Sequence, residues 1–142
     1  MIFDNEMEIE FSSLSKNESF ARTVVAAFVS QLNPTLEEIA DIKTAVSEAV
    51  TNSIIHGYRN TVGKIIMHCG IKGNEVFVDI IDHGVGIEDI PKAMEPLFTT
   101  SPEMERSGMG FAFMSAFMDQ LDVESKKNEG TTVKMKKRIA TT

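Results

Sequence analysis

The order of the patterned segments is the feature that most limits the fold of this 142-residue chain. Residues 7–11 alternate apolar and acidic side chains, which is the period of a half-buried strand. Four further segments have the composition of strands: 64–71, 75–82, 121–126 and 131–139. Because helical patterns separate these strands, the order predicts an α+β two-layer sandwich. We expect a mixed, mostly antiparallel sheet with helices on one face.

Two helices are expected between the first strand and the strand at 64–71. Ser15 with Glu18, and Thr35 with Glu38, each form the signature of a capping box at a helix start. The second helix is expected to end at Gly57, as its C′ residue. Apolar residues recur at helical spacing behind the first box: Phe20, Val24, Ala27 and Phe28.

Residues 83–108 follow neither the helical nor the strand period, and glycine and proline interrupt them repeatedly. An unstructured span of more than about 15 residues inside a compact domain is usually disordered or a functional lid. A buried helix is expected next, at 109–118. Since no linker or repeat divides the chain, we expect one domain over residues 1–142.

Charge and composition exclude several classes of function. The net charge is −7, made of −12 over residues 1–125 and +5 over residues 126–142. An acidic body argues against direct nucleic-acid binding, which needs cationic neutralisation of phosphates. The basic C-terminal segment is either an edge strand guarded by lysines or an interaction patch.

The compartment can also be predicted from the sequence. The longest apolar run, residues 24–29, is too short to span a bilayer. The first residues have no basic segment followed by an apolar stretch, so a secretion signal is not expected. A single cysteine, Cys69, cannot form an internal disulfide. We therefore expect a cytoplasmic protein with no membrane partner.

One helix face carries the first candidate site. Glu48, Asn52 and His56 stand at positions i, i+4 and i+8 of the second expected helix, so they share one face. Carboxylate and amide oxygens are the ligands that Mg²⁺ accepts. The alternative is an ordinary row of solvated polar side chains.

Glycines mark two more candidate sites. Asp82 ends a predicted strand, and Gly84 and Gly86 follow it at alternate positions, which lets the backbone approach a ligand closely. The alternative is a plain turn. Gly108 and Gly110 lie at the start of the helix predicted at 109–118, whose free N–H groups suit an anion such as phosphate; the alternative is a hinge. No P-loop and no zinc spacing of cysteine and histidine is present.

In this order, four segments resemble the motifs of the GHKL superfamily of ATPases and kinases, which have a Bergerat-type nucleotide fold. These segments are Glu48–Asn52, Asp82–Gly86, Gly108–Gly110 and Gly130-Thr131. Longer local matches, such as 46–58 and 105–111, resemble the anti-sigma F factor family of spore-forming bacilli. The resemblance extends from about Asn5 to about Thr132. His83 departs from the acidic or amide residue that is common at its position in the family.

The resemblance implies roles for individual residues. Glu48 resembles the general base that accepts a proton from a serine hydroxyl, and Asn52 resembles the Mg²⁺ ligand. Asp82 resembles the carboxylate that binds adenine, with room made by Gly84 and Gly86. The remaining nucleotide-binding residues implied by the resemblance are Thr131 near the adenine and Ser107, Gly108, Met109 and Gly110 around the phosphates.

The resemblance also implies an ATP lid at about 88–107, with Arg106 as a catalytic residue near the γ-phosphate. For Arg106, a surface salt bridge to Glu103 or Glu105 is the alternative. Arg22, placed opposite Phe20 on the first helix, is the candidate contact for partner proteins; the alternative is an ordinary solvated arginine.

The implied function is an anti-sigma factor that is also an ATP-dependent protein-serine kinase, acting on its anti-anti-sigma antagonist. ATP or ADP and Mg²⁺ are the implied cofactors, and the partners are a sigma factor, the antagonist and a second copy of the chain. The first alternative is a nucleotide-gated switch that binds sigma factor with little or no catalysis. The second is a histidine-kinase catalytic domain that acts on a histidine in trans.

Overall fold

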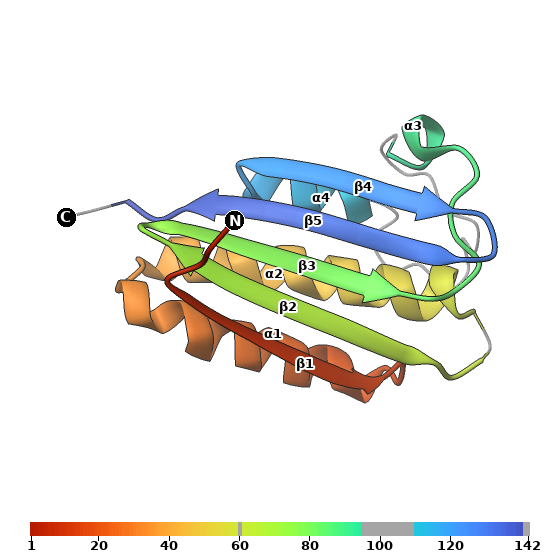
Figure 1. Cartoon of the computed structure of the whole chain (residues 1–142), viewed down its shortest axis with the longest axis horizontal. Coiled ribbons are helices and arrows are strands. Elements are labelled where there is room, and N and C mark those ends of the chain that lie inside the picture. Colours follow the sequence, from red (N-terminus) through yellow and green to blue (C-terminus); the bar gives the residue numbers. More distant parts are fainter. Residues whose placement is uncertain (60, 95–109, 141–142) are drawn as a thin grey trace.

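A five-stranded sheet forms one layer of the molecule (Figure 1). The computed structural model describes residues 1–59, 61–94 and 110–140. In sheet order, the strands are β1 (Asn5–Ser12), β2 (Lys64–Lys72), β3 (Glu75–Asp82), β5 (Gly130–Arg138) and β4 (Gln120–Lys126). All four neighbouring pairs are antiparallel, so the sheet that was expected to be mixed contains no parallel pair among these strands.

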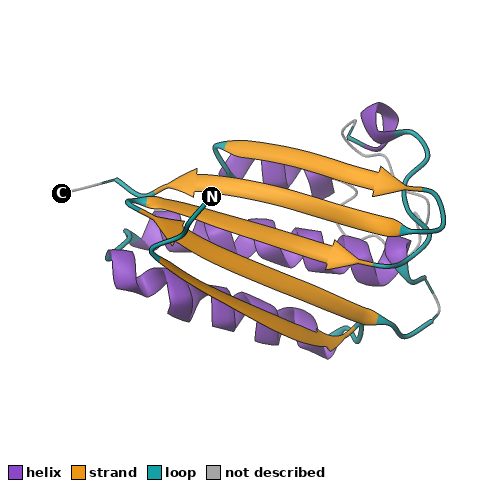
Figure 2. Cartoon of the chain, viewed as in Figure 1, coloured by secondary structure: helices purple, strands orange, loops and turns teal. Residues whose placement is uncertain are grey.

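Helices form the second layer, on one face of the sheet only (Figure 2). The three longer ones are α1 (Lys16–Val29), α2 (Leu36–Asn52) and α4 (Gly110–Phe117). A short 3₁₀ turn, η1 (Ser30–Leu32), follows α1, and α3 (Ile90–Ala93) lies beyond β3. The two-layer α+β prediction is confirmed. No helix within the described ranges is long and apolar enough to cross a membrane.

The buried face of α1 differs from the predicted one by one position. Ala21, Val25 and Val29 are fully buried, whereas Phe20 is 50% exposed. Phe20 instead packs edge-on against Phe11 of β1, with ring centroids 6.4 Å apart. Small side chains on the inner face let α1 lie close to α2, against which it packs.

Only one of the two expected capping boxes forms. Thr35 Oγ1 accepts a hydrogen bond of 3.1 Å from the Glu38 N–H, and Glu38 Oε1 accepts one of 2.8 Å from the Thr35 N–H. Ser15 makes no side-chain cap bond, because its backbone is already helical. Glu18 accepts instead from the Ser47 hydroxyl of α2.

This difference between the two boxes predicts different stabilities of two matched variants. Thr35→Ala is expected to lower the free energy of unfolding by about 1 kcal/mol, the usual cost of a lost cap. Ser15→Ala is expected to change it by less than about 0.5 kcal/mol. Urea denaturation of both variants measures the difference, and equal losses would contradict the assignment.

The end of α2 is not the expected glycine C-cap. The α-helix ends at Asn52 and continues as a π-helical turn, η2 (Ser53–Gly57). The Tyr58 N–H donates to the Ser53 carbonyl at 2.9 Å, which is an i→i+5 bond. Gly57 is buried and does not have the positive φ of a C′ glycine. It is needed for space, since a Cβ there would lie 3.0 Å from the Asp82 carboxylate.

The basic C-terminal segment is not an edge strand. The edge strand beside it is β4, and β5 lies inside the sheet. Its lysines pair with acidic residues of neighbouring elements: Lys134 with Glu124 at 3.2 Å, Lys136 with Glu75 at 2.7 Å and Lys137 with Asp41 at 3.5 Å.

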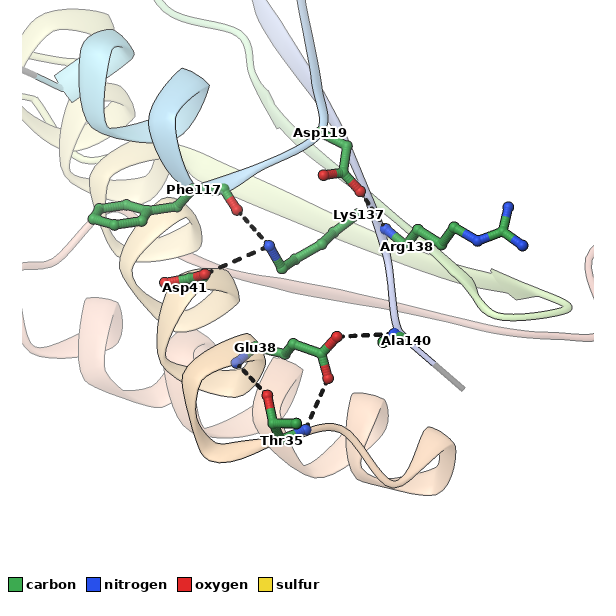
Figure 3. A network of polar contacts seen from close by, with 8 residues as sticks. All are labelled: Thr35, Glu38, Asp41, Phe117, Asp119, Lys137, Arg138 and Ala140. Atoms are coloured by element: carbon green, nitrogen blue, oxygen red, sulfur yellow. Dashed lines mark hydrogen bonds and ion pairs between the residues drawn. The ribbon is translucent and has the colours of Figure 1, made fainter. Parts of the chain in front are cut away.

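A polar network attaches this end of β5 to the helices (Figure 3). Lys137 Nζ also donates to the Phe117 carbonyl at the end of α4, at 2.8 Å. The Ala140 N–H donates to Glu38 Oε2 at 2.8 Å, which holds the pKa of Glu38 below its usual range. Lys137 therefore joins the two layers, whereas Lys134 and Lys136 form their ion pairs within the sheet. Arg138 and Lys126–Lys127 lie at the exposed ends of the segment.

Candidate functional site

A cavity of about 580 Å³ is lined by residues from the end of α2 and the end of β3. Its volume is in the range of small-molecule sites. Its lining includes five of the residues predicted from sequence: Asn52, Asp82, Gly86, Gly110 and Thr131. The structure thus brings together residues that are up to 79 positions apart, from Asn52 to Thr131.

The other predicted residues have different placements. Glu48 lies beside the start of α4, where a Cβ on Gly110 would be 3.7 Å from Glu48 Oε2. Gly84 lies behind the cavity, against η2. Four residues lie outside the described ranges: Arg106, Ser107, Gly108 and Met109. Most of the predicted lid, 88–107, also lies outside the described ranges. Its first part contains α3, of which Lys92 and Ala93 line the cavity.

Asp82 is the buried acid of the site, with 2% of its surface exposed. Its Oδ2 accepts a hydrogen bond of 2.8 Å from the Ser53 hydroxyl, and its Oδ1 accepts one of 3.0 Å from the Gly84 N–H. Burial raises the pKa of Asp82, and these two hydrogen bonds, together with one from the Thr131 backbone, oppose the rise. A carboxylate has about four acceptor positions, so one remains for a donor on a ligand in the cavity.

Two glycines allow the backbone after Asp82 to pack as it does. A Cβ on Gly84 would lie 2.2 Å from the Gly57 carbonyl oxygen. Gly86 has a φ of +77° and would place a Cβ 2.2 Å from the Lys126 carbonyl oxygen. The loop is held from both sides, since the Val85 N–H donates to Gly57 at 2.9 Å and the Asn128 N–H donates to Val85 at 2.7 Å. Any side chain at Gly84 or Gly86 would push this loop out of place.

Thr131 completes the wall opposite η2. It is 4% exposed, and its Oγ1 lies 2.7 Å from the Ser125 hydroxyl. Ser125 in turn accepts from the Ile87 N–H at 2.7 Å, so the start of β5 is tied to the glycine loop. Sequence reasoning missed both Ser53 and Ser125. Each makes its contact with a residue 29 or 38 positions away, and nothing local distinguishes it from an ordinary serine.

Asn52, the predicted metal ligand, suits a metal ion that is held mainly by the phosphates of a bound nucleotide. Asn52 and His56 both line the cavity. Among the described residues, no group of three His, Cys, Asp or Glu side chains could hold a metal ion alone. Mg²⁺ commonly takes one or two protein oxygens and completes its shell with water and substrate phosphates. An amide oxygen from Asn52 at the cavity suits that arrangement.

Arg22 lies away from the cavity, on α1. Its side chain is 41% exposed, and its Nε is 3.8 Å from Glu18 Oε1. Glu18 also accepts from Ser47, the residue before Glu48. The expected partner contact is therefore accessible, and it is connected through one carboxylate to the helix that carries Glu48 and Asn52.

Cys69 has no part in this site. It is buried in the core, and burial raises the pKa of its thiol to about 12. A thiol that stays protonated is a poor nucleophile and a poor metal ligand.

Comparison with known proteins identifies the family of the chain. The family described as histidine kinase-like ATPase domain matches residues 11–137. An ATPase domain implies that the chain binds a nucleotide. An anti-sigma F factor of Clostridium kluyveri is 62% identical over 136 residues, covering 96% of each chain. One from a Thermoanaerobacter species is 63% identical over 139 residues, covering 98% of this chain and 97% of the relative.

A solved structure has the same fold at low sequence identity. It contains the RsbU and RsbW domains of Rv1364c from Mycobacterium tuberculosis. The superposition has a TM-score of 0.69 at 20% identity and covers 95% of this chain. This chain spans 32% of the length of that one. From the family match and the two relatives, the chain belongs to the anti-sigma F factors and carries the histidine kinase-like ATPase domain.

Proposed function

We propose that this chain binds a sporulation sigma factor and, with ATP and Mg²⁺, phosphorylates a serine of an anti-anti-sigma protein. One observation carries the proposal: Asn52, Asp82 and Gly110 meet at a single cavity, with Glu48 beside Gly110. Phosphoryl transfer needs positioning and charge neutralisation more than covalent chemistry by the protein. The printed names of the relatives support the sigma-factor partner.

Each residue has a proposed task within this site. Asp82 accepts from the exocyclic amine of adenine, with Thr131 nearby, while Gly84 and Gly86 give the loop its shape. Asn52 would hold Mg²⁺, which would supply positive charge to offset that of the phosphates. Glu48 accepts the proton of the attacking serine hydroxyl. The proposed phosphate cradle is the start of α4 at Gly110 with three residues that precede it: Ser107, Gly108 and Met109.

The lid over about 88–107 is proposed to close on the nucleotide. Arg106 is assigned to the γ-phosphate, where its positive charge would stabilise the transition state. Lys92 and Ala93, which line the cavity beside Asp89 of the α3 cap, support a lid that starts at this wall.

Two surfaces are proposed for protein partners. Arg22 is assigned to contacts with the sigma factor and with the anti-anti-sigma protein, and its exposure supports this role. A homodimer is proposed through β1, which is an edge strand with an unpaired side. No direct nucleic-acid contact is proposed, and the complex would act in the cytoplasm, where the single cysteine stays reduced.

The experiment combines the purified chain with γ-labelled ATP, Mg²⁺ and the anti-anti-sigma protein, followed by an acid wash. Acid-stable label on the small partner is the expected result. Acid-labile label would indicate transfer to histidine and overturn the serine assignment. Absence of label with ATP bound would leave a nucleotide-gated switch, for which the Arg22–Glu18–Ser47 connection to α2 is the supporting observation.

Ser53→Ala tests the role of Asp82 independently of catalysis. The variant loses the hydroxyl that donates to Asp82 Oδ2 at 2.8 Å. We expect ATP affinity to fall about 2- to 12-fold, the value of one hydrogen bond. Because that bond lowers the pKa of Asp82, its loss raises the pKa further. Acidification should therefore weaken ATP binding at a higher pH in the variant than in the wild type.

Isothermal titration calorimetry with ATP over a pH series measures both effects. Ser115→Ala, on the exposed side of α4, is the matched control and should keep the wild-type profile. Identical pH profiles for Ser53→Ala and the wild type would contradict the role of Ser53.

A further inference from the structure

The π turn η2 and the residue after it hold the end of β3 at three points. The Ser53 hydroxyl donates to the Asp82 carboxylate at 2.8 Å, and the Gly57 carbonyl accepts from the Val85 N–H at 2.9 Å. The third contact is a hydrogen bond of 2.8 Å from the His83 N–H to the Tyr58 hydroxyl. The i→i+5 hydrogen bond of the π turn joins the Tyr58 N–H to the Ser53 carbonyl, and the side chains of both residues contact residues 82–83. π-turns inside helices frequently occur at functional sites.

The Tyr58 hydroxyl bridges two strands. It donates to the Lys64 carbonyl at the start of β2, at 2.5 Å, and accepts from His83, directly after Asp82. A carbonyl can only accept and an N–H can only donate, so the phenol must keep its proton. Burial raises the pKa of Tyr58, which is consistent with a neutral phenol.

The Tyr58 ring is also fixed by its packing. A Cβ on Gly63 would lie 2.2 Å from a ring carbon, so the ring lies directly against the Gly63 backbone. Tyr58 does not line the cavity. Its effect on a ligand must therefore pass through the backbone of residues 82–84.

We propose that Tyr58 is a positioning residue for base recognition: its hydroxyl fixes the His83 backbone and thereby aims the Asp82 carboxylate at the exocyclic amine of adenine. This inference rests on the proposed function and adds to it a residue that sets base selectivity. The two hydrogen bonds already made by Asp82 leave it few orientations. A small rotation of the backbone at 82–84 would turn its remaining acceptor position away from the base.

The test compares two nucleotides whose bases differ at C6, which carries an amine in ATP and a carbonyl in ITP, and at N1, which carries a hydrogen only in ITP. ITP carries a carbonyl oxygen where ATP carries the amine, so an ionised Asp82 attracts the first poorly and the second well. Tyr58→Phe removes the hydroxyl and keeps the ring. We expect its ATP affinity to fall about 3- to 12-fold while its ITP affinity changes little, so the ATP/ITP ratio decreases.

The control is Thr61→Val, which removes a hydroxyl that donates to the Tyr58 carbonyl at 2.6 Å without reaching β3. Its ATP/ITP ratio should equal that of the wild type. An unchanged ratio in Tyr58→Phe would overturn the positioning role. If the wild type itself binds ITP as tightly as ATP, the adenine role of Asp82 fails, which is a separate result.

A measurement on the wild type covers the case in which Tyr58→Phe does not fold. Tyr58 is the only tyrosine in the chain. Its Cζ resonance in protein labelled with ¹³C at that atom therefore reports on this hydroxyl alone. We expect the resonance to shift on addition of ATP and to shift less with ITP. Equal shifts with both nucleotides, or none with either while ATP binds, would overturn the proposal.

Discussion

Asp82→Asn is expected to weaken ATP binding by about 10- to 150-fold, the value of a hydrogen bond to a charged group. The amide keeps the shape of the side chain, and the Ser53 hydroxyl can reverse its role and accept from it. The variant has one neutral carbonyl oxygen in place of two charged carboxylate oxygens. Where its NH₂ group faces the exocyclic amine of adenine, both groups are donors and no hydrogen bond forms. Calorimetric titration with ATP measures the loss.

The same variant is expected to be at least as stable as the wild type without nucleotide. The pKa of Asp82 is raised by burial, so the folded state binds this proton more tightly than the unfolded state. The free energy of unfolding of the wild type therefore falls as pH rises from the ordinary pKa of an aspartate through the raised pKa of Asp82. It stays at the lower value above that pH range. Asparagine does not titrate, so the stability difference should widen in its favour between acid and neutral pH.

Asp79→Asn is the matched control. Asp79 is three residues earlier on β3, and burial also raises its pKa, but its side chain lies 3.9 Å from His68 on the other face of the sheet. It should keep wild-type ATP affinity. If Asp82→Asn bound ATP normally, or if both variants lost affinity equally, Asp82 would not be the base-recognition group.

Much of the fold could be predicted because its signals are local. The strands alternate and α2 has a long apolar stripe; the strands form close to their expected bounds, and α2 begins where it was expected but ends earlier, at Asn52. The two capping boxes show where this reasoning stops. They have the same signature, but Ser47 of α2 binds Glu18, whereas Glu38 remains available to its own cap. The decisive contact joins residues that are 29 positions apart.

The strand order had the same limitation. The hairpin of β4 and β5 could be predicted, but not which of the two borders β3. Val133 and Met135 are buried while Lys134 and Lys136 pair with acids, so the alternation in β5 is that of an inner strand with one charged face. In the site, the motif residues could be recognised, whereas Ser53, Tyr58 and Ser125 support them through contacts made only in the folded chain.

Glu48→Gln is expected to lower the rate of phosphoryl transfer about 10²- to 10⁴-fold, the usual value of general base catalysis. ATP affinity should stay within about threefold of the wild type, because glutamine keeps the size and most contacts of the side chain and no direct contact of Glu48 with the nucleotide is proposed. Glu48 is one turn before Asn52 on α2, and its Oε2 lies beside Gly110. That places a carboxylate between the metal ligand and the proposed phosphate cradle, where a serine hydroxyl would have to approach.

A carboxylate is a weak base for a serine hydroxyl, so its contribution depends on position in the transition state rather than on basicity. The substitution removes the proton acceptor and keeps size and hydrogen bonding, so the loss should fall on the rate of transfer and not on nucleotide affinity. Glu37→Gln, at the exposed start of the same helix, is the control with the same change of charge and should phosphorylate normally. Label transfer in single-turnover assays and ATP titrations of the same preparations separate the two quantities. A wild-type rate of transfer in Glu48→Gln would remove Glu48 from the chemistry and leave positioning by Asn52 and the lid as the source of catalysis.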